Sequence, residues 1–250
     1  MMLEARNLQK SFGQITATDD VSLEFGREAG EMVFIVGPNG AGKTTLVNLL
    51  TGLLEPDSGS VVMDDREITS MEPDDRVHAG LVRSFQVVQV FEEMTVRENL
   101  RTAVLSERGL TSSMFSFSDE YEDVESTVAS LLDRFRLDEE ADVVADTLPH
   151  GDRKLLDVAM SFGLDPSYLL LDEPTAGVSA QETEYVIETI VEASKARNVT
   201  TVAIEHDMDI VSAYADRIVA LHQGAVLGQG DATILETDEE LRRVLLGVEE

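Results

Sequence analysis

The sequence contains no cysteine, few basic residues and no long apolar run. Without cysteine, the chain can have no disulfide framework, no thiolate metal site and no cysteine nucleophile. No stretch approaches the roughly 18 consecutive apolar residues that a membrane-spanning helix needs, and the first residues lack the apolar segment of a signal peptide. We therefore expect a cytoplasmic protein.

The charge balance is strongly acidic. There are 19 basic and 49 acidic residues, a formal net charge of −30, and only 4 of the basic residues are lysines. Such a surface repels the phosphate backbone of DNA and RNA, so we expect no nucleic-acid partner. An acidic surface that is poor in lysine also suggests a halophilic protein, because salt screens the repulsion between its carboxylates.

A phosphate-binding pattern, G-x-x-x-x-G-K-[ST], lies between the apolar run 32–36 and the helical pattern 46–54. In this pattern the glycines let backbone N–H groups surround phosphate oxygens, and the next helix points its positive N-terminus at the same anion. Lys43 would reach the β and γ phosphates, and Thr44 would ligate Mg²⁺. The candidate nucleotide-binding residues are Gly37, Pro38, Asn39, Gly40, Ala41, Gly42, Lys43, Thr44 and Thr45.

The rest of the chain reads as an α/β protein. Short apolar runs before residue 36 predict strands, and the segment near 95–160 has mostly helical spacing. From residue 168 onward strands alternate with helices, which predicts parallel strands joined by crossover helices. The expected architecture is one domain, residues 1–250, in which a helical lobe interrupts an α/β core. The predicted strands of the last part are 168–171, 200–204 and 217–222.

Polar residues follow two of these strands directly. Asp172 and Glu173 end the run from Tyr168, and His206 follows the strand 200–204. Because ligands gather at the carboxyl ends of parallel strands, Asp172 can face a metal ion and Glu173 can orient or deprotonate the attacking water. His206 would lie near Glu173, and the amide of Gln86 could reach Mg²⁺ or the water. Taken singly, an acidic pair or a histidine at a strand end is also an ordinary solvated feature.

The ordered set of motifs resembles the ATP-binding subunit of ABC transporters over nearly the whole chain. The matching segments are Walker A at 37–45, the Q-loop at Gln86, the signature at 148–152, Walker B at 168–173 and the switch at His206. The resemblance implies a P-loop NTPase core with an N-terminal antiparallel β lobe and an inserted helical subdomain. It also implies an ATPase that uses ATP and Mg²⁺, with Phe12 stacking on adenine.

The same resemblance implies partners. Two such subunits enclose two ATP molecules, each held by one Walker A loop and by the signature of the other subunit, to which Gly151 belongs. Integral-membrane permease subunits would dock near the Q-loop, where 87–94 would contribute to the contact surface. The chain would thus be peripheral to the cytoplasmic face of the cell membrane and reach the membrane only through partners.

The signature departs from the pattern of the family. Pro149 replaces the usual serine, His150 a glycine and Asp152 a glutamine, and Ser179 stands where an aspartate usually follows Walker B. Because the signature serves the ATP held by the partner, the lost serine hydroxyl would weaken one of two composite sites. We therefore expect a heterodimer with unequal sites.

Four further segments are similar to those of branched-chain amino acid importers: 82–86, 93–100, 174–178 and 205–208. Urea and short-chain amide importers share these features, so a cargo of that kind is an alternative. A soluble ATPase of the same fold, such as one for iron–sulfur assembly, is another, and a nucleotide-binding module without turnover is a third. Association with a membrane permease would distinguish a transporter subunit from a soluble ATPase, and ATP hydrolysis would distinguish both from a module without turnover.

Overall fold

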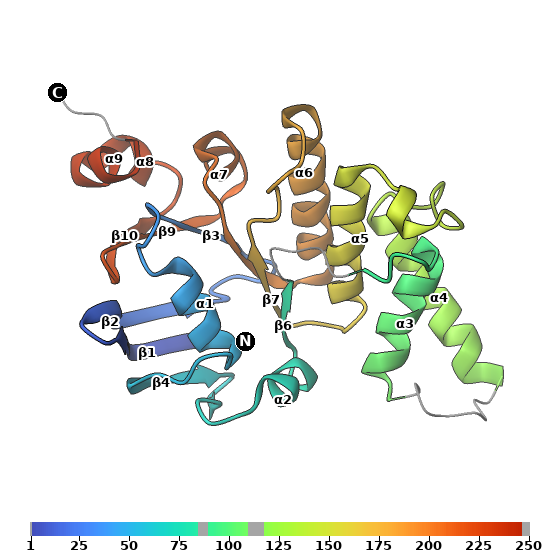
Figure 1. Ribbon diagram of the computed structural model, residues 1–250, viewed down its shortest axis with the longest axis horizontal. Coiled ribbons are helices and arrows are strands. Elements are labelled where there is room, and N and C mark those ends of the chain that lie inside the picture. The colour runs from blue at the N-terminus through green and yellow to red at the C-terminus, as the bar shows by residue number, and fades with distance from the viewer. Residues whose placement is uncertain (1, 85–89, 110–117, 247–250) are drawn as a thin grey trace.

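The computed structural model describes residues 2–84, 90–109 and 118–246. Two sheets form the body of the molecule (Figure 1). The first has the order β2-β1-β4-β5, and all of its strand pairs are antiparallel. Its strands are β1 (Leu3–Phe12), β2 (Ile15–Phe25), β4 (Ser58–Met63) and β5 (Arg66–Glu67). The antiparallel N-terminal lobe is thus confirmed.

The second sheet has the order β10-β9-β3-β8-β7-β6. Its strands are β3 (Met32–Val36), β6 (Leu81–Ser84), β7 (Tyr168–Asp172), β8 (Thr200–Ile204), β9 (Arg217–His222) and β10 (Ala225–Gly230). All of its pairs are parallel except the hairpin of β9 and β10. The parallel core predicted from the alternating pattern is confirmed, with β8 and β9 spanning the predicted residues.

Nine helices occur in the described part of the chain, and one 3₁₀ turn (Ala145–Thr147) precedes α5. They are α1 (Lys43–Thr51), α2 (Pro73–His78), α3 (Val96–Glu107), α4 (Ser118–Arg134), α5 (His150–Phe162), α6 (Ala180–Arg197), α7 (Met208–Tyr214), α8 (Ile234–Thr237) and α9 (Glu239–Leu246). In the described ranges no helix is both long enough and apolar enough to cross a bilayer.

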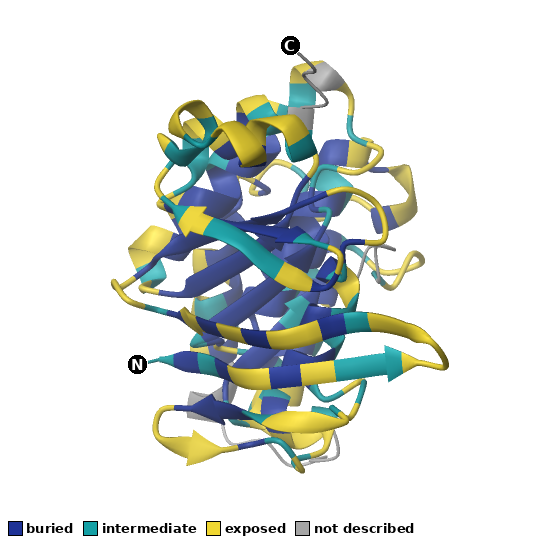
Figure 2. Ribbon diagram, turned by 90° about the vertical axis from the view of Figure 1, so that its left-hand side faces the viewer, coloured by how far each residue is buried: buried dark blue, intermediate teal, exposed yellow. Residues whose placement is uncertain are grey.

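Two apolar cores lie on the two faces of the parallel sheet, as the alternation of β3 shows. Val33 and Ile35 face α1 and the antiparallel sheet, whereas Met32, Phe34 and Val36 face the helices on the other side. Figure 2 shows the parallel strands as almost entirely buried, while β1 and β2 alternate between buried and exposed residues. A sheet covered on both faces buries the side chains on both sides of each strand, which explains its nearly continuous apolar runs.

The helical lobe consists of α3 and α4, which pack beside α5 at the far side of the molecule from the antiparallel sheet (Figure 1). One face of α4 is buried, as its apolar spacing predicted, and Phe135 just beyond it meets Phe162 edge-on at 5.1 Å between ring centroids. The helix α5 begins at His150, within the signature segment 148–152. Pro149 is its N-cap, and the Pro149 carbonyl already accepts the N–H of Arg153 at 3.0 Å.

Candidate nucleotide-binding site

The glycine-rich loop joins β3 to α1, as predicted. Gly37, Gly40 and Gly42 all have positive φ angles, of 150°, 81° and 100°. A Cβ atom at Gly37 or Gly42 would lie 2.2 Å from a carbonyl oxygen, that of Leu221 or Ala17, so the loop is packed tightly against β9 and β2. At Gly40 a Cβ atom would meet nothing within 4 Å. The loop is therefore rigid at its two ends and open at its tip, which suits an anion cradle.

Lys43 is the first residue of α1 and is buried. Its Nζ donates to the carbonyl oxygens of Gly37 at 2.6 Å and Pro38 at 3.2 Å, so the side chain runs back over the loop. Burial lowers the pKa of Lys43, and the charges of Glu173 and Asp172 oppose that effect. The ammonium group is thus held on the phosphate loop, within electrostatic range of Asp172 and Glu173.

The remaining loop residues form the rim and the base of the same cradle. Pro38, Asn39 and Gly40 are exposed, and Ala41 is buried beneath them. In the first turn of α1, Thr44 is exposed and Thr45 is half-buried. An exposed hydroxyl at a helix N-terminus is available to a ligand held by the loop.

Asp172 lies at the end of β7, where it meets a buried arginine that sequence reasoning did not single out. Its Oδ2 accepts from Arg83 Nη2 at 2.7 Å, and Arg83 Nη1 donates to Asn48 of α1 at 2.5 Å. The next residue of β6, Ser84, donates to the buried Asp157 of α5 at 2.6 Å. The end of β6 therefore ties the phosphate-loop helix, the end of β7 and the signature helix together.

Oxygen donors at this place suit Mg²⁺. Thr44 supplies a hydroxyl and Asp172 a carboxylate, and Mg²⁺ characteristically takes one or two protein oxygens together with phosphate and water. The third predicted donor, Gln86, lies outside the described residues.

Glu173 and His206 lie together, as their places after neighbouring parallel strands predicted. His206 Nε2 is 3.0 Å from Glu173 Oε1, although the two residues are 33 apart in the sequence. Glu173 has a φ of 52°, a left-handed conformation that is uncommon for residues other than glycine, and its N–H donates to the carbonyl of Ile204 at 3.2 Å. The turn of the chain at Glu173 directs its carboxylate across to the end of β8.

Two predicted site residues lie on other elements. Phe12 ends β1 in the antiparallel sheet and is 49% exposed, with Lys10 Nζ over its ring at 6.0 Å from the centroid. Gly151 is buried in the first turn of α5. Next to it, His150 lies against the loop after β7, since a Cβ atom at Gly177 would be 2.9 Å from His150 Nε2. Ser179 caps α6, and its hydroxyl donates to Glu182 at 2.5 Å.

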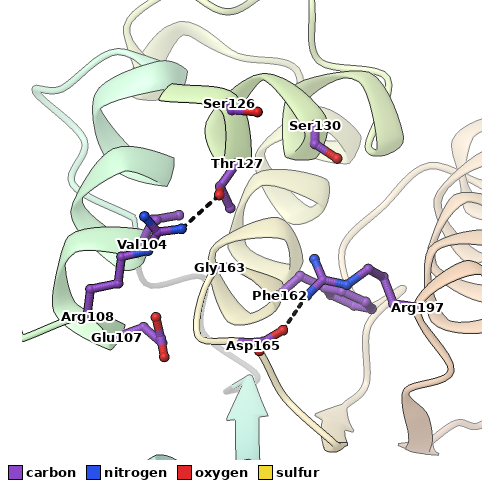
Figure 3. Close-up of a pocket in the computed structure, with 10 residues that line it drawn as sticks. All are labelled: Val104, Glu107, Arg108, Ser126, Thr127, Ser130, Phe162, Gly163, Asp165 and Arg197. Carbon is purple, nitrogen blue, oxygen red and sulfur yellow. Dashed lines mark hydrogen bonds and ion pairs between the residues drawn. The ribbon is translucent and has the colours of Figure 1, made fainter. Parts of the chain in front are cut away.

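A polar pocket of about 330 Å³ between α3, α4, α5 and the end of α6 is a second concave place (Figure 3). Both of its arginines are engaged by acids: Arg197 with Asp165, and Arg108 with Asp123 at 2.7 Å. Asp165 precedes the start of β7, so the pocket lies toward the opposite end of that strand from Asp172. Its neutralised arginines make it a poor phosphate site.

These features together define a P-loop nucleotide-binding protein: a glycine cradle, a buried lysine over it, and two carboxylates at the end of another parallel strand of the same sheet. Comparison with known proteins agrees. The ABC transporter family model matches residues 19–176. The chain is 36% identical to the high-affinity branched-chain amino acid transport ATP-binding protein LivG of Salmonella typhimurium and 34% identical to the corresponding protein BraF of Pseudomonas aeruginosa. Both alignments cover 98% of this chain and 98% of the relative.

The fold is also that of solved relatives. The structure matches an ATP-binding cassette of an ABC transporter in its ADP conformation with a TM-score of 0.84 and 31% identity, over 99% of each chain. The chain therefore belongs to the ABC transporter family and is an ATPase of the ATP-binding cassette class. The resemblance and the fold class inferred from its motifs are confirmed.

Proposed function

We propose that this protein is the ATP-hydrolysing subunit of an importer for branched-chain amino acids. The observation that carries the cargo is the 36% identity with LivG across 98% of both chains. The names of LivG and BraF favour branched-chain amino acids over urea and short-chain amides, and they favour a transporter over a soluble assembly ATPase. The geometry of the strand ends supports the hydrolytic step.

In this proposal one end of the nucleotide contacts the antiparallel sheet and the other end contacts the loop that follows β3 of the parallel sheet. Adenine stacks on the exposed ring of Phe12, and the phosphates lie in the loop from Gly37 to Thr45. The Lys43 ammonium, which donates to the carbonyls of Gly37 and Pro38, would turn from them to the β and γ phosphates. That exchange replaces two neutral acceptors with charged ones, which form stronger hydrogen bonds.

Thr44, Asp172 and Gln86 would hold Mg²⁺, which when bound neutralises charge on the phosphates. Glu173 accepts the proton of the attacking water, and its position next to His206 supports that role. His206 orients the Glu173 carboxylate and donates toward the γ-phosphate. The Arg83 contact leaves the second carboxylate oxygen of Asp172 to face the metal.

The proposed assembly is a heterodimer with a second ATP-binding subunit, attached to integral-membrane permease subunits at the cytoplasmic face of the membrane. Pro149 supports unequal composite sites, because it caps α5 where a serine hydroxyl would face the partner's nucleotide. Of the proposed permease contact 87–94, residues 87–89 lie outside the described part, and Phe91 and Met94 are 48% and 39% exposed. All of this is carried by one domain, 1–250, with a helical subdomain near 95–160.

The burial and ion pairing of the four lysines support adaptation to high salt. Lys43 and Lys154 are buried, whereas Lys10 and Lys195 are paired with Asp57 and Asp216. Lysine thus adds little positive charge to the surface, where carboxylates outnumber the arginines, and the net charge is −30. Concentrated salt would screen the resulting repulsion.

Calorimetry of ATP binding in concentrated KCl tests the site, with Lys43→Met as the variant and Lys195→Met as the matched control. We expect Lys43→Met to weaken binding at least about a hundredfold, since it loses a charge-assisted contact to phosphate worth about 3 kcal/mol. The control, at an exposed lysine paired with Asp216, should bind as the wild type does. Equal binding by the two variants would refute the proposed site.

Reconstitution with the permease subunits tests the cargo. The assembled transporter should take up leucine, isoleucine or valine in an ATP-dependent manner, and Glu173→Gln should abolish uptake. Uptake of urea without uptake of branched-chain amino acids would overturn the proposed cargo but leave the ATPase intact.

A further inference from the structure

Glu205 is a buried carboxylate that the site described above does not use. It directly follows β8 and precedes His206, and it is only 3% exposed. Its Oε1 accepts from the Thr175 hydroxyl at 2.5 Å and from the Thr175 N–H at 3.3 Å. Its Oε2 accepts from the N–H of His206 at 3.0 Å. One side chain thus joins the loop after β7 to the loop after β8.

Among the described residues, Glu205 forms no ion pair within 4 Å, and the nearby Arg83 pairs with Asp172 instead. Burial lowers the pKa of Lys154 of α5, and the charge of Glu205 opposes that effect less than the charges of Asp157 and Asp172 do. A buried carboxylate without a close counter-ion is costly unless donors satisfy it. Here the donors are those of the two loops that carry Glu173 and His206.

The bonds to Glu205 constrain the candidate catalytic pair from both sides. Thr175 lies two residues after Glu173, whose left-handed backbone depends on the loop around it. His206 is held through its own N–H, beside the side chain that contacts Glu173. Freeing either bond would let the imidazole and the carboxylate move apart.

We propose that Glu205 is a positioning residue of the ATPase, which clamps Thr175 to His206 and so keeps His206 against Glu173. The proposal rests on the proposed roles of Glu173 and His206. Misplacement of a reacting group by about 1 Å can cost up to a hundredfold in rate, so a clamp of this kind controls turnover more than substrate binding.

The test removes the hydrogen bond from the Thr175 hydroxyl to Glu205 and leaves Glu173 and His206 unchanged. Thr175→Val deletes the hydroxyl donor and keeps the shape, and Thr175→Ser restores the donor. The matched control is Thr189→Val on α6, because Thr189 is also a buried hydroxyl donor, bonded to the Tyr185 carbonyl at 2.8 Å. Glu205→Gln serves the same purpose as Thr175→Val should the latter not fold.

The measurements are kcat and KM for ATP, together with the carbon–proton NMR spectrum of the protein labelled with ¹³C at histidine Cε1. The chain has 4 histidines, so the His206 peak is identified by its loss in His206→Gln. We expect Thr175→Val to lower kcat about tenfold or more, to leave KM within about twofold, and to move the His206 peak. Thr175→Ser should return both, and Thr189→Val should change neither.

An unchanged kcat in Thr175→Val, or a reduced kcat with an unmoved His206 peak, would overturn the proposal. Failure of the proposed catalytic site gives a different result, because His206→Gln would then hydrolyse ATP at the wild-type rate.

Discussion

Alanine substitutions at Gly42 and Gly40 distinguish two reasons for a glycine in the phosphate loop, its backbone conformation and its close packing. Gly42→Ala tests both reasons, and Gly40→Ala is the control that tests the backbone conformation alone. Both have positive φ, so alanine at either position pays about 1–2 kcal/mol for a left-handed backbone. Only at Gly42 would the added Cβ also meet a backbone atom, the Ala17 carbonyl oxygen of β2 at 2.2 Å, whereas the space around Gly40 is open to 4 Å. The steric conflict adds about 1–3 kcal/mol, the usual cost of overpacking.

Gly42→Ala should therefore lower the free energy of unfolding by about 2–5 kcal/mol, and Gly40→Ala by about 1–2 kcal/mol. Urea unfolding of the nucleotide-free variants at fixed KCl concentration measures the difference. Gly42→Ala should also weaken ATP binding, because the loop must shift away from β2 to admit the methyl group. Equal destabilisation of the two variants would refute the argument from packing, since the backbone angle would then account for the whole effect.

Three other predictions concern stability. Arg217→Met should cost about 3–5 kcal/mol at pH 7, because it leaves Glu31 buried without the guanidinium that now bonds to it at 2.8 Å. Burial by itself raises the pKa of Glu31, but Arg217 and two backbone N–H groups lower it by more, so the pKa in the folded protein is below its usual value of 4.5. The unfolded chain therefore binds more protons, and this stabilisation should fade as the pH falls below about 4.5. Unfolding curves of Arg217→Met should lack that acid-dependent loss, and a parallel pH dependence would contradict the assignment. Arg76→Met should lower the free energy of unfolding by at least about 3 kcal/mol, because the fully buried guanidinium donates to four main-chain carbonyls at the end of α1 and before α2. The control Arg66→Met, at an exposed site, should lower it by less than about 0.5 kcal/mol. The unfolding temperature of the wild type should rise with KCl up to molar concentrations, because screening relieves a net charge of −30, and a flat response would contradict the halophilic interpretation.

Local features of the site were predictable from the sequence. The phosphate loop is contiguous, and its conformation follows from glycines and one lysine at fixed spacing, so it needs no distant partner. The contact of Glu173 with His206 was also predictable, since each follows one of two neighbouring parallel strands and strand ends meet at one edge of the sheet. The apolar runs of β3, β7, β8 and β9 show the same dependence on local pattern.

The partners of the buried charges were not predictable. Arg83 pairs with Asp172, which is 89 residues away in the sequence, and Arg217 pairs with Glu31, which is 186 residues away. With 49 acidic residues in the chain, each arginine has many possible partners, and only the strand order and register place one of them within hydrogen-bonding distance.

The sequence by itself determined the nucleotide cradle, the alternation of strands and helices, and the residue types at the strand ends. The tertiary structure decided which buried charges meet and how the loops after β7 and β8 are joined through Glu205. The physical reason is range: backbone conformation and apolar periodicity depend on neighbouring residues, whereas the choice of an ion-pair or hydrogen-bond partner depends on distances that exist only after the sheets have packed.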